Sequence, residues 1–121
     1  MADTEKSYLI AAASSDGIVV NQHFGRADRF IIYRVDDGVV CPTGEIREVN
    51  PVCSGGDHNE DLMLENIKKL SDCRYVLVSR IGQRALMLTE QNGITAMEIP
   101  GMIEESIAKI TAYNSIQDLF G

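Results

Sequence analysis

The chain has 121 residues, of which 45% are apolar, and it carries a net charge of −7 at pH 7. That length fits one domain able to bury a core without disulfide or metal staples. The acidic balance argues against nucleic acid as a partner, because such binding relies on Lys and Arg that neutralise phosphates. No stretch approaches the roughly 20 apolar residues that cross a bilayer, and the start has neither a basic region nor a long apolar core. We therefore expect a cytoplasmic protein that binds neither nucleic acid nor membranes.

The first half of the chain alternates between β-branched or aromatic runs and tight-turn signals. Residues 1–6 are polar and are expected to be frayed, so the single domain is expected to span 7–121. Strands are predicted at 7–14, 29–35 and 39–49, and 18–21 is either a short strand or an extended loop. The last of these strands contains Pro42 and Gly44, which favour a bulge. This order predicts an antiparallel meander.

The second half changes to a helical period of apolar residues. Helices are predicted at 57–70, 82–93 and 102–113, with 115–120 compatible with a last helical turn, and strands at 74–79 and 94–99. The apolar positions that define buried helix faces are Met63, Leu64, Ile67 and Leu70 in the first helix and Ile103, Ile107 and Ile110 in the last. Asp57 with Glu60 matches an N-terminal capping box, and Asn92-Gly93 matches a helix end.

The predicted order is three strands followed by α-β-α-β-α. Strands separated by helices imply right-handed parallel crossovers, whereas the meander is antiparallel. We therefore predict an α/β protein with a mixed sheet and helices on its faces. This arrangement resembles the ribonuclease H-like three-layer fold.

One constellation that can carry chemistry is His23 with Phe24, Gly25, Arg26 and Arg29. The two flanks of this segment are predicted strands, so the histidine lies in a connection. It is a packed loop residue bonded to the backbone, a catalytic base, or a ligand; the residue types alone leave all three readings open.

A second constellation lies in the stretch PVCSGGDHNED, residues 51–61. Cys53 precedes Gly55 and Gly56, and His58 follows at the predicted start of a helix. Glycines allow backbone N–H groups to approach a ligand, and a helix N-terminus favours anions and lowers the pKa of a thiol. The alternative is a glycine-rich loop with a buried thiol and a surface histidine.

Three cysteines without a CxxC pair argue against a disulfide framework and against a self-contained zinc site. We interpret Cys41 and Cys73 as small buried apolar residues. A ribonuclease H-like nuclease needs several carboxylates that converge on metal ions, and the first strand, YLIAAAS, contains none. A hydrolase or nuclease is therefore disfavoured.

The stretch ASSDGIVVNQHFGRADRFIIYRVDDG resembles the start of the dinitrogenase iron–molybdenum cofactor biosynthesis family, which includes NifX, the core of NafY and the carboxy-terminal domain of NifB. Its hallmark is a strand, a turn and a histidine–phenylalanine–glycine triplet before a strand that begins near an aromatic residue. His23, Phe24, Gly25 and Phe30 occupy those places. The stretches VCSGGDHNED and CRYVLVSRIGQRALMLTEQNGI also resemble the family, so the similarity runs from about residue 8 to 113. No CxxxCxxC motif of the NifB radical-enzyme portion is present, which indicates the stand-alone small form.

The resemblance implies a carrier or chaperone in metallocluster biosynthesis rather than an enzyme. Its cargo is expected to be an iron–sulfur cluster, the iron–molybdenum cofactor or a precursor, and its partners are cluster donor and recipient proteins. The oligomeric state is expected to be a monomer or a weak homodimer. The alternative is a regulatory or partner-binding module of the same fold without a cluster.

For this carrier role we expect His23 to be the primary ligand, because imidazole and thiolate suit iron and other transition metals. The next candidate ligands are Cys53 and His58. The remaining residues expected at the cofactor are Phe24, Gly25, Arg26, Gly55 and Gly56.

Overall fold

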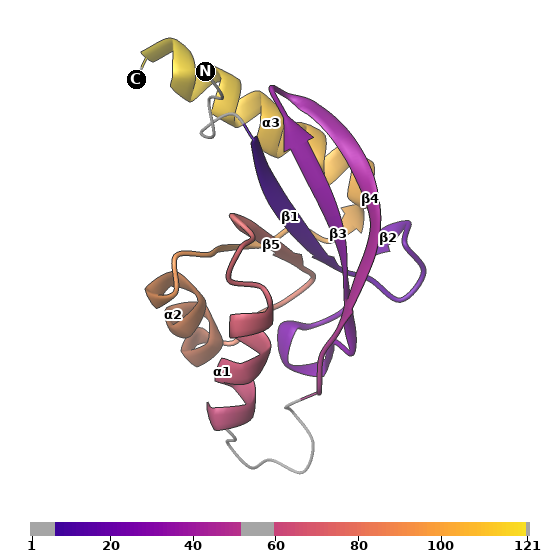
Figure 1. The fold of residues 1–121 in the computed structure, drawn as a ribbon, viewed down its shortest axis with the longest axis vertical. Coiled ribbons are helices and arrows are strands. Elements are labelled where there is room, and N and C mark those ends of the chain that lie inside the picture. The colour runs from indigo at the N-terminus through magenta and orange to yellow at the C-terminus, as the bar shows by residue number, and fades with distance from the viewer. Residues whose placement is uncertain (1–6, 52–59, 121) are drawn as a thin grey trace.

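The computed structural model describes residues 7–51 and 60–120, with the side chains described as far as Asn114. In chain order the elements are β1 (Ser7–Ala13), β2 (Val19–Val20), the 3₁₀ helix η2 (Phe24–Arg26), β3 (Arg29–Asp36), β4 (Val39–Glu48), α1 (Glu60–Lys69), β5 (Tyr75–Val78), α2 (Gln83–Gln91), β6 (Thr95–Glu98), β7 (Gly101–Met102) and α3 (Ile103–Phe120). The predicted mixed α/β arrangement is confirmed, and Figure 1 shows it. The capping box at Asp57 lies outside the described residues.

Strand β1 is the centre of the main sheet. In the part of the chain that the structure describes, this sheet has five strands in the order β4-β3-β1-β5-β6. β1 pairs antiparallel with β3 along its whole length, from Ser7 opposite Asp36 to Ala13 opposite Phe30. On its other side it pairs parallel with β5, which pairs parallel with β6. Hence β1, β5 and β6 all end at one edge of the sheet, called here the carboxyl edge.

Helices cover both faces of the sheet, so the side chains of β1 alternate between two cores. Ala11 and Ala13 face α1 and α2, where they pack in one cluster with Ile67 and Leu88. Ile10 and Ala12 face α3 and pack in a second cluster that includes Ile103, Ile107 and Ile110. Figure 1 shows α3 behind the sheet, with α1 and α2 on the other side. The predicted apolar helix faces are therefore the buried ones.

The bulge predicted in the 39–49 strand is present in β4. The register with β3 shifts so that Ile31 pairs with Ile46 but Tyr33 pairs with Pro42. Gly44 lies in this interval at φ 76°, a backbone conformation that residues with a Cβ rarely adopt. The Thr43 hydroxyl donates to the carbonyl oxygen of Ile32 at 2.7 Å and holds the bulge against its neighbour.

The interpretation of Cys41 as a buried residue is wrong, whereas that of Cys73 is confirmed. Cys41 is exposed on β4, which forms an edge of the sheet and is solvent-exposed along most of its length. Cys73 is 2% exposed in the core beside α1. A strand sequence alone does not reveal whether the strand lies at an exposed edge of the sheet, and this explains the error.

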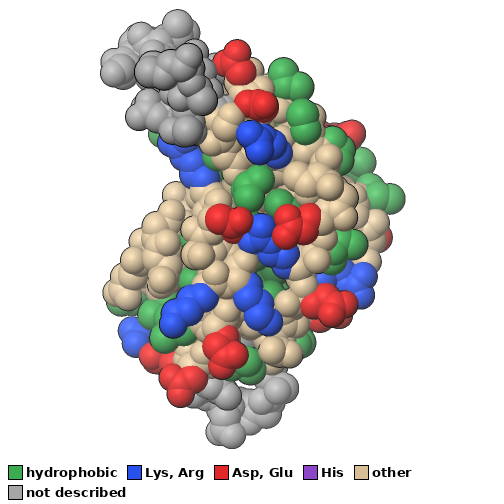
Figure 2. Space-filling model, viewed as in Figure 1, with side chains coloured by type: hydrophobic (Ala, Val, Ile, Leu, Met, Phe, Trp, Pro, Cys, Tyr) green, Lys and Arg blue, Asp and Glu red, His purple; other side chains and the backbone are tan. Residues whose placement is uncertain are grey.

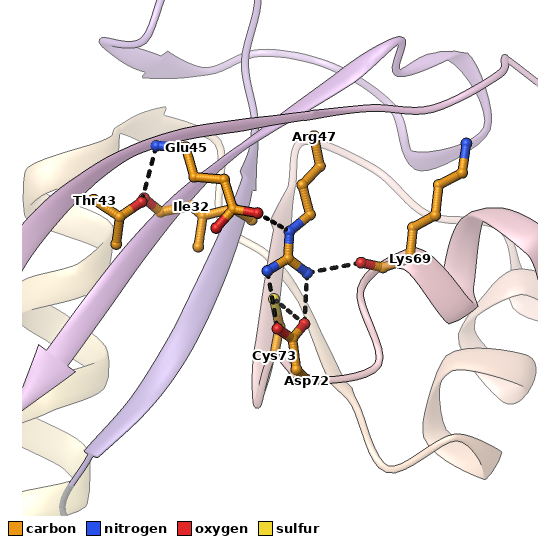
Figure 3. A network of polar contacts seen from close by, with 7 residues as sticks. All are labelled: Ile32, Thr43, Glu45, Arg47, Lys69, Asp72 and Cys73. Carbon is orange, nitrogen blue, oxygen red and sulfur yellow. Dashed lines mark hydrogen bonds and ion pairs between the residues drawn. The ribbon is translucent and has the colours of Figure 1, made fainter.

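An arginine on β4 ties this edge to the turn between α1 and β5 (Figure 3). The Arg47 guanidinium donates two hydrogen bonds to the Asp72 carboxylate, one of them at 2.9 Å, and a third to the backbone oxygen of Lys69. It also bonds Glu45 at 2.7 Å. The hydrogen bonds from Arg47 hold the pKa of Asp72 below its ordinary value. The network therefore favours the ionised carboxylate.

A second, small ribbon joins two distant parts of the chain. The short segment predicted near 18–21 forms β2, which pairs antiparallel with β7. The sequence predicts that Pro100-Gly101 ends the 94–99 strand, and in the structure β7 begins at Gly101. The backbone N–H of Ile103 donates to the carbonyl oxygen of Ile18 at 2.9 Å, so the start of α3 is tied to the segment after β1.

The last helix is continuous through Asn114 rather than ending at 113. The Asn114 side chain donates to the Tyr8 hydroxyl at 2.9 Å and accepts from the Tyr75 hydroxyl at 3.0 Å. Asn114 therefore lies within the helix and makes a tertiary contact with tyrosines of β1 and β5.

Replacing Asp72 by Asn tests the network of Figure 3. Because the folded pKa of Asp72 is lowered, its ionised form stabilises the fold above about pH 4, and this contribution is lost as the pH falls through the lowered pKa. Since the Asp72 side chain is 55% exposed, solvent screening limits the expected loss in unfolding free energy at pH 7 to about 0.5–1 kcal/mol. Urea unfolding at pH 7 and pH 3 measures the free energy of unfolding of the parent and of Asp72→Asn. The difference between them is expected to be smaller at pH 3 than at pH 7. Glu90→Gln, at an exposed position of α2, is the control. A stability loss in Asp72→Asn that is the same at both pH values would contradict the ionic explanation.

Alkylation tests the environments of the two described cysteines. Burial, followed by the charge of Asp72, raises the pKa of Cys73 to about 12, so its thiol stays protonated and inaccessible at pH 7.5. Iodoacetamide is expected to modify Cys41 in the native protein and Cys73 only after unfolding in urea, as read by peptide mass spectrometry. Equal native rates at both positions would contradict the buried location of Cys73.

Candidate functional site at the carboxyl edge of the sheet

The segment after β1 carries His23, and a tight turn begins it. The Ser14 hydroxyl accepts from the N–H of Gly17 at 2.9 Å, and the Asp16 carboxylate accepts from the N–H groups of Ile18 and Val19 at 2.8 and 3.1 Å. The bond from Ile18, followed by that from Val19, lowers the pKa of Asp16. The predicted Asp-Gly turn is confirmed, and Gly17 has φ 79°. These bonds direct the chain back across the end of β1.

The histidine loop, residues 21–28, is anchored to the core by Phe24. This ring is 4% exposed and packs against Phe30, with ring centroids 6.0 Å apart. At the end of the loop, the N–H of Val49 donates to the carbonyl oxygen of Asp28 at 3.0 Å. The burial of Phe24 means that it supports the loop and offers little surface to a ligand.

His23 itself is exposed and lies beside Arg80, just beyond the end of β5. The two residues form an isolated parallel bridge, in which the N–H of Phe24 donates to the carbonyl oxygen of Arg80 at 2.8 Å. The N–H of Ser79 donates to the carbonyl oxygen of Gln22 at 3.0 Å. Paired residues of a ladder project their side chains to the same side. His23 and Arg80 are thus exposed neighbours at the carboxyl edge, where ligands of α/β sheets commonly bind.

Basic side chains accompany the histidine. Arg26, at the end of η2, is exposed, as is Arg80. Arg29, which follows on β3, is paired with Asp28 at 3.6 Å. On the face drawn in Figure 2, acidic and basic side chains are interspersed over the surface. Arg26 is among the site residues predicted from the sequence, whereas Arg80 is not, because no local pattern connects positions 23 and 80.

The bridge segment also contains two buried polar atoms that have no hydrogen-bond partner among the described residues. They are the side-chain oxygen of Gln22 and the hydroxyl oxygen of Ser79. Such an atom costs about 1–3 kcal/mol when it is left unpaired. Backbone bonds and the packing of Phe24, rather than side-chain polar contacts, therefore hold this segment.

The second predicted constellation, Cys53, Gly55, Gly56 and His58, lies outside the described residues. Hydrogen bonds tie the described residues on both sides of it to α1 and α2. On one side Asn66 of α1 donates to the carbonyl oxygen of Asn50 at 2.6 Å and accepts from its N–H at 3.2 Å. On the other, Arg84 of α2 donates two hydrogen bonds of 2.9 Å to the carboxylate of Glu60.

Within residues 7–51 and 60–120, no group of three or more His, Cys, Asp or Glu side chains is placed to hold a metal ion. The described helices include none that is long and apolar enough to span a membrane. His23 is thus a single exposed imidazole with two basic neighbours. This arrangement can supply one ligand and positive charge, but not a closed metal cage.

The fold and site define a class of protein: a small mixed α/β domain that presents a histidine loop at the carboxyl edge of its sheet. A family model described as "Dinitrogenase iron-molybdenum cofactor" matches residues 6–113, and the chain belongs to this family. The family takes part in iron–molybdenum cofactor biosynthesis, and its domains are non-catalytic.

Named relatives agree with this membership, and a solved structure shares the fold. The chain is 36% identical over 118 residues to the FeMo cofactor biosynthesis protein NifB of Chlorobaculum tepidum, covering 97% of this chain and 27% of that protein. It is 38% identical over 107 residues to NifB of Frankia alni, covering 86% of this chain and 21% of that protein. The chain therefore spans about a quarter of the length of these relatives. The crystal structure of PH0822 has the same fold, with a TM-score of 0.65, 22% identity, and coverage of 86% of this chain and 90% of that one.

Truncating Phe24 tests how the histidine loop is held. Phe24→Ala is expected to lower the free energy of unfolding by about 3 kcal/mol, because it leaves a cavity against Phe30, whereas Phe24→Leu should cost about 1–1.5 kcal/mol. Ile18→Ala, at a nearby side chain that is 55% exposed, should change it by less than about 0.5 kcal/mol. Urea denaturation measures all three. Equal, small losses in the Phe24 variants would contradict its role as the anchor.

Proposed function

We propose that the chain binds an iron–sulfur cluster, the iron–molybdenum cofactor or a precursor of it, and carries this cargo from a donor protein to a recipient protein. The observation that carries the proposal is the exposed His23 imidazole, held at the carboxyl edge by backbone bonds on both sides of the loop. Membership in a cofactor biosynthesis family supports it.

In this proposal each site residue has a distinct role. His23 is the primary ligand, because a neutral imidazole nitrogen binds iron and other transition metals. Arg26 adds positive charge toward an anionic cluster, and Gly25 lets the backbone approach it. Phe24 acts indirectly by fixing the loop. These roles use groups that are exposed or that anchor the loop, so binding requires no rearrangement of the core.

Cys53 and His58 are proposed as further ligands, with Gly55 and Gly56 giving backbone access. The flanks of this segment support the proposal: Asn50 follows Val49, which is bonded to the end of the histidine loop, and Glu60 is bonded to α2, which begins shortly after Arg80. Ligation of cluster iron by a thiolate and by an imidazole is established chemistry for iron–sulfur clusters.

A site with few protein ligands suits a carrier, because the cargo must be released to a recipient. Four firmly held ligands would favour a resident cofactor instead. We propose in addition that the chain is cytoplasmic and is a monomer or weak homodimer. The strand order β4-β3-β1-β5-β6, with β4, β3 and β1 antiparallel and β5 and β6 parallel to β1, further supports a ribonuclease H-like assignment.

Anaerobic binding of isolated iron–molybdenum cofactor tests the proposal. The parent protein is expected to bind it stoichiometrically, and His23→Ala is expected to bind more than about tenfold more weakly, because even outer-shell partners of metal ligands contribute 10–100-fold. Bound iron and the visible spectrum are the measurements. The substitution should leave stability unchanged, because the side chain is exposed.

Cys53→Ala and His58→Ala are run beside it to assign the further ligands, with Arg34→Gln as a surface control. Loss of binding only in Cys53→Ala would move the primary ligand to the glycine-rich segment. Failure of the parent to bind any cluster, together with capture of a protein partner, would replace the carrier by a regulatory or partner-binding module.

A further inference from the structure

The histidine loop lies in an unusual charge environment for an acidic protein. The chain has 18 acidic and 11 basic residues, so its arginines are expected to form ion pairs with carboxylates. Most of the seven arginines do so or stack on aromatic rings. The engaged arginines are Arg29, Arg34, Arg47 and Arg84, each in an ion pair, and Arg74, which lies over the rings of Tyr8 and Tyr75.

Arg26 and Arg80 are the two whose side chains make no ion pair, hydrogen bond or ring contact within the described part of the chain. Both are neighbours of His23, one at the end of the following 3₁₀ turn and the other across the bridge. The carboxylate of Glu98, near the same edge, accepts instead from the N–H of Ile81 at 2.8 Å. Two arginines whose side chains are unpaired within the described residues therefore flank His23.

The backbone fixes where Arg80 stands, whatever its side chain does. Its carbonyl oxygen accepts from the N–H of Phe24, whose ring is buried, so the residue is held beside His23 by a bond that no side-chain substitution removes. Residues paired in a bridge project their side chains to the same side, and both His23 and Arg80 are exposed. The guanidinium and the imidazole thus share one exposed surface.

We propose that Arg80 is a specificity-determining residue that makes this site select an anionic cargo, with the guanidinium bonding the anion while His23 binds its metal. The inference rests on the proposed carrier function and adds the sign of the cargo's charge to it. An arginine suits this role, because its planar fork presents several donors and stays charged at all relevant pH values. Hydrogen bonds from an ionised donor to an anion are about twice as strong as neutral ones.

Two anionic probes test the proposal. Binding of the tetrathiomolybdate dianion is measured from the His23 imidazole signals in NMR, and binding of isolated iron–molybdenum cofactor is measured as bound iron. Arg80→Gln is expected to bind both roughly tenfold more weakly, and Arg80→Lys less than about threefold. The affinity of the parent should fall more steeply with salt than that of Arg80→Gln. The matched control is Arg34→Gln, which removes the same charge from an exposed residue of β3. Arg34 lies roughly 16 Å along that strand from its start, so this variant should bind both probes as the parent does.

The outcomes separate this inference from the proposed function. If the cofactor binds the parent and Arg80→Gln equally while His23→Ala fails to bind, Arg80 has no selective role and the carrier function stands. If tetrathiomolybdate binds in an Arg80-dependent way and the cofactor does not bind, the anion site stands and the carrier function falls. If the parent binds neither probe, both the Arg80 proposal and the carrier function are overturned. If Arg80→Gln and Arg34→Gln lose equal affinity, the Arg80 proposal alone is overturned.

Discussion

The structure depends on the pairing of β1 with strands on both of its sides. Residues Ile10 to Ala13 are fully buried, and their alternating side chains serve two separate cores. Alanines at three of these positions allow helices to pack closely on each face, while the backbone of β1 pairs with β3 on one side and with β5 on the other. Every later element is placed relative to this strand, and the histidine loop begins where it ends.

This arrangement separates the groups that hold the site from the groups that can act in it. The buried rings of Phe24 and Phe30 set the position of the loop. The backbone hydrogen bonds across the end of β5 do so as well. His23 and Arg80 are exposed and contribute little to stability. A carrier gains from this separation, because cargo can bind and leave without disturbing the core. The same separation makes substitutions at His23 and Arg80 informative about function rather than folding.

Much of the fold follows from local patterns. Residue period distinguishes strands from helices, the apolar spacing in α1 and α3 identifies their buried faces, and Pro42 with Gly44 indicates the bulge. The errors have a common cause in tertiary context. Cys41 looks like a core residue because its strand is β-branched, yet β4 is an exposed edge. The helix predicted at 102–113 continues past Asn114, whose side chain bonds tyrosines of two strands.

The sequence by itself determined the order of the elements, the family resemblance and the choice of His23, because each depends on residues close together in the chain. Only the tertiary structure decided that β2 pairs with β7 and that Arg80 stands beside His23. Those contacts join positions far apart in the chain through backbone hydrogen bonds, which any residue except proline can donate. Such bonds leave no side-chain signature in the sequence, and this is why the basic partner of the histidine emerges only from the fold.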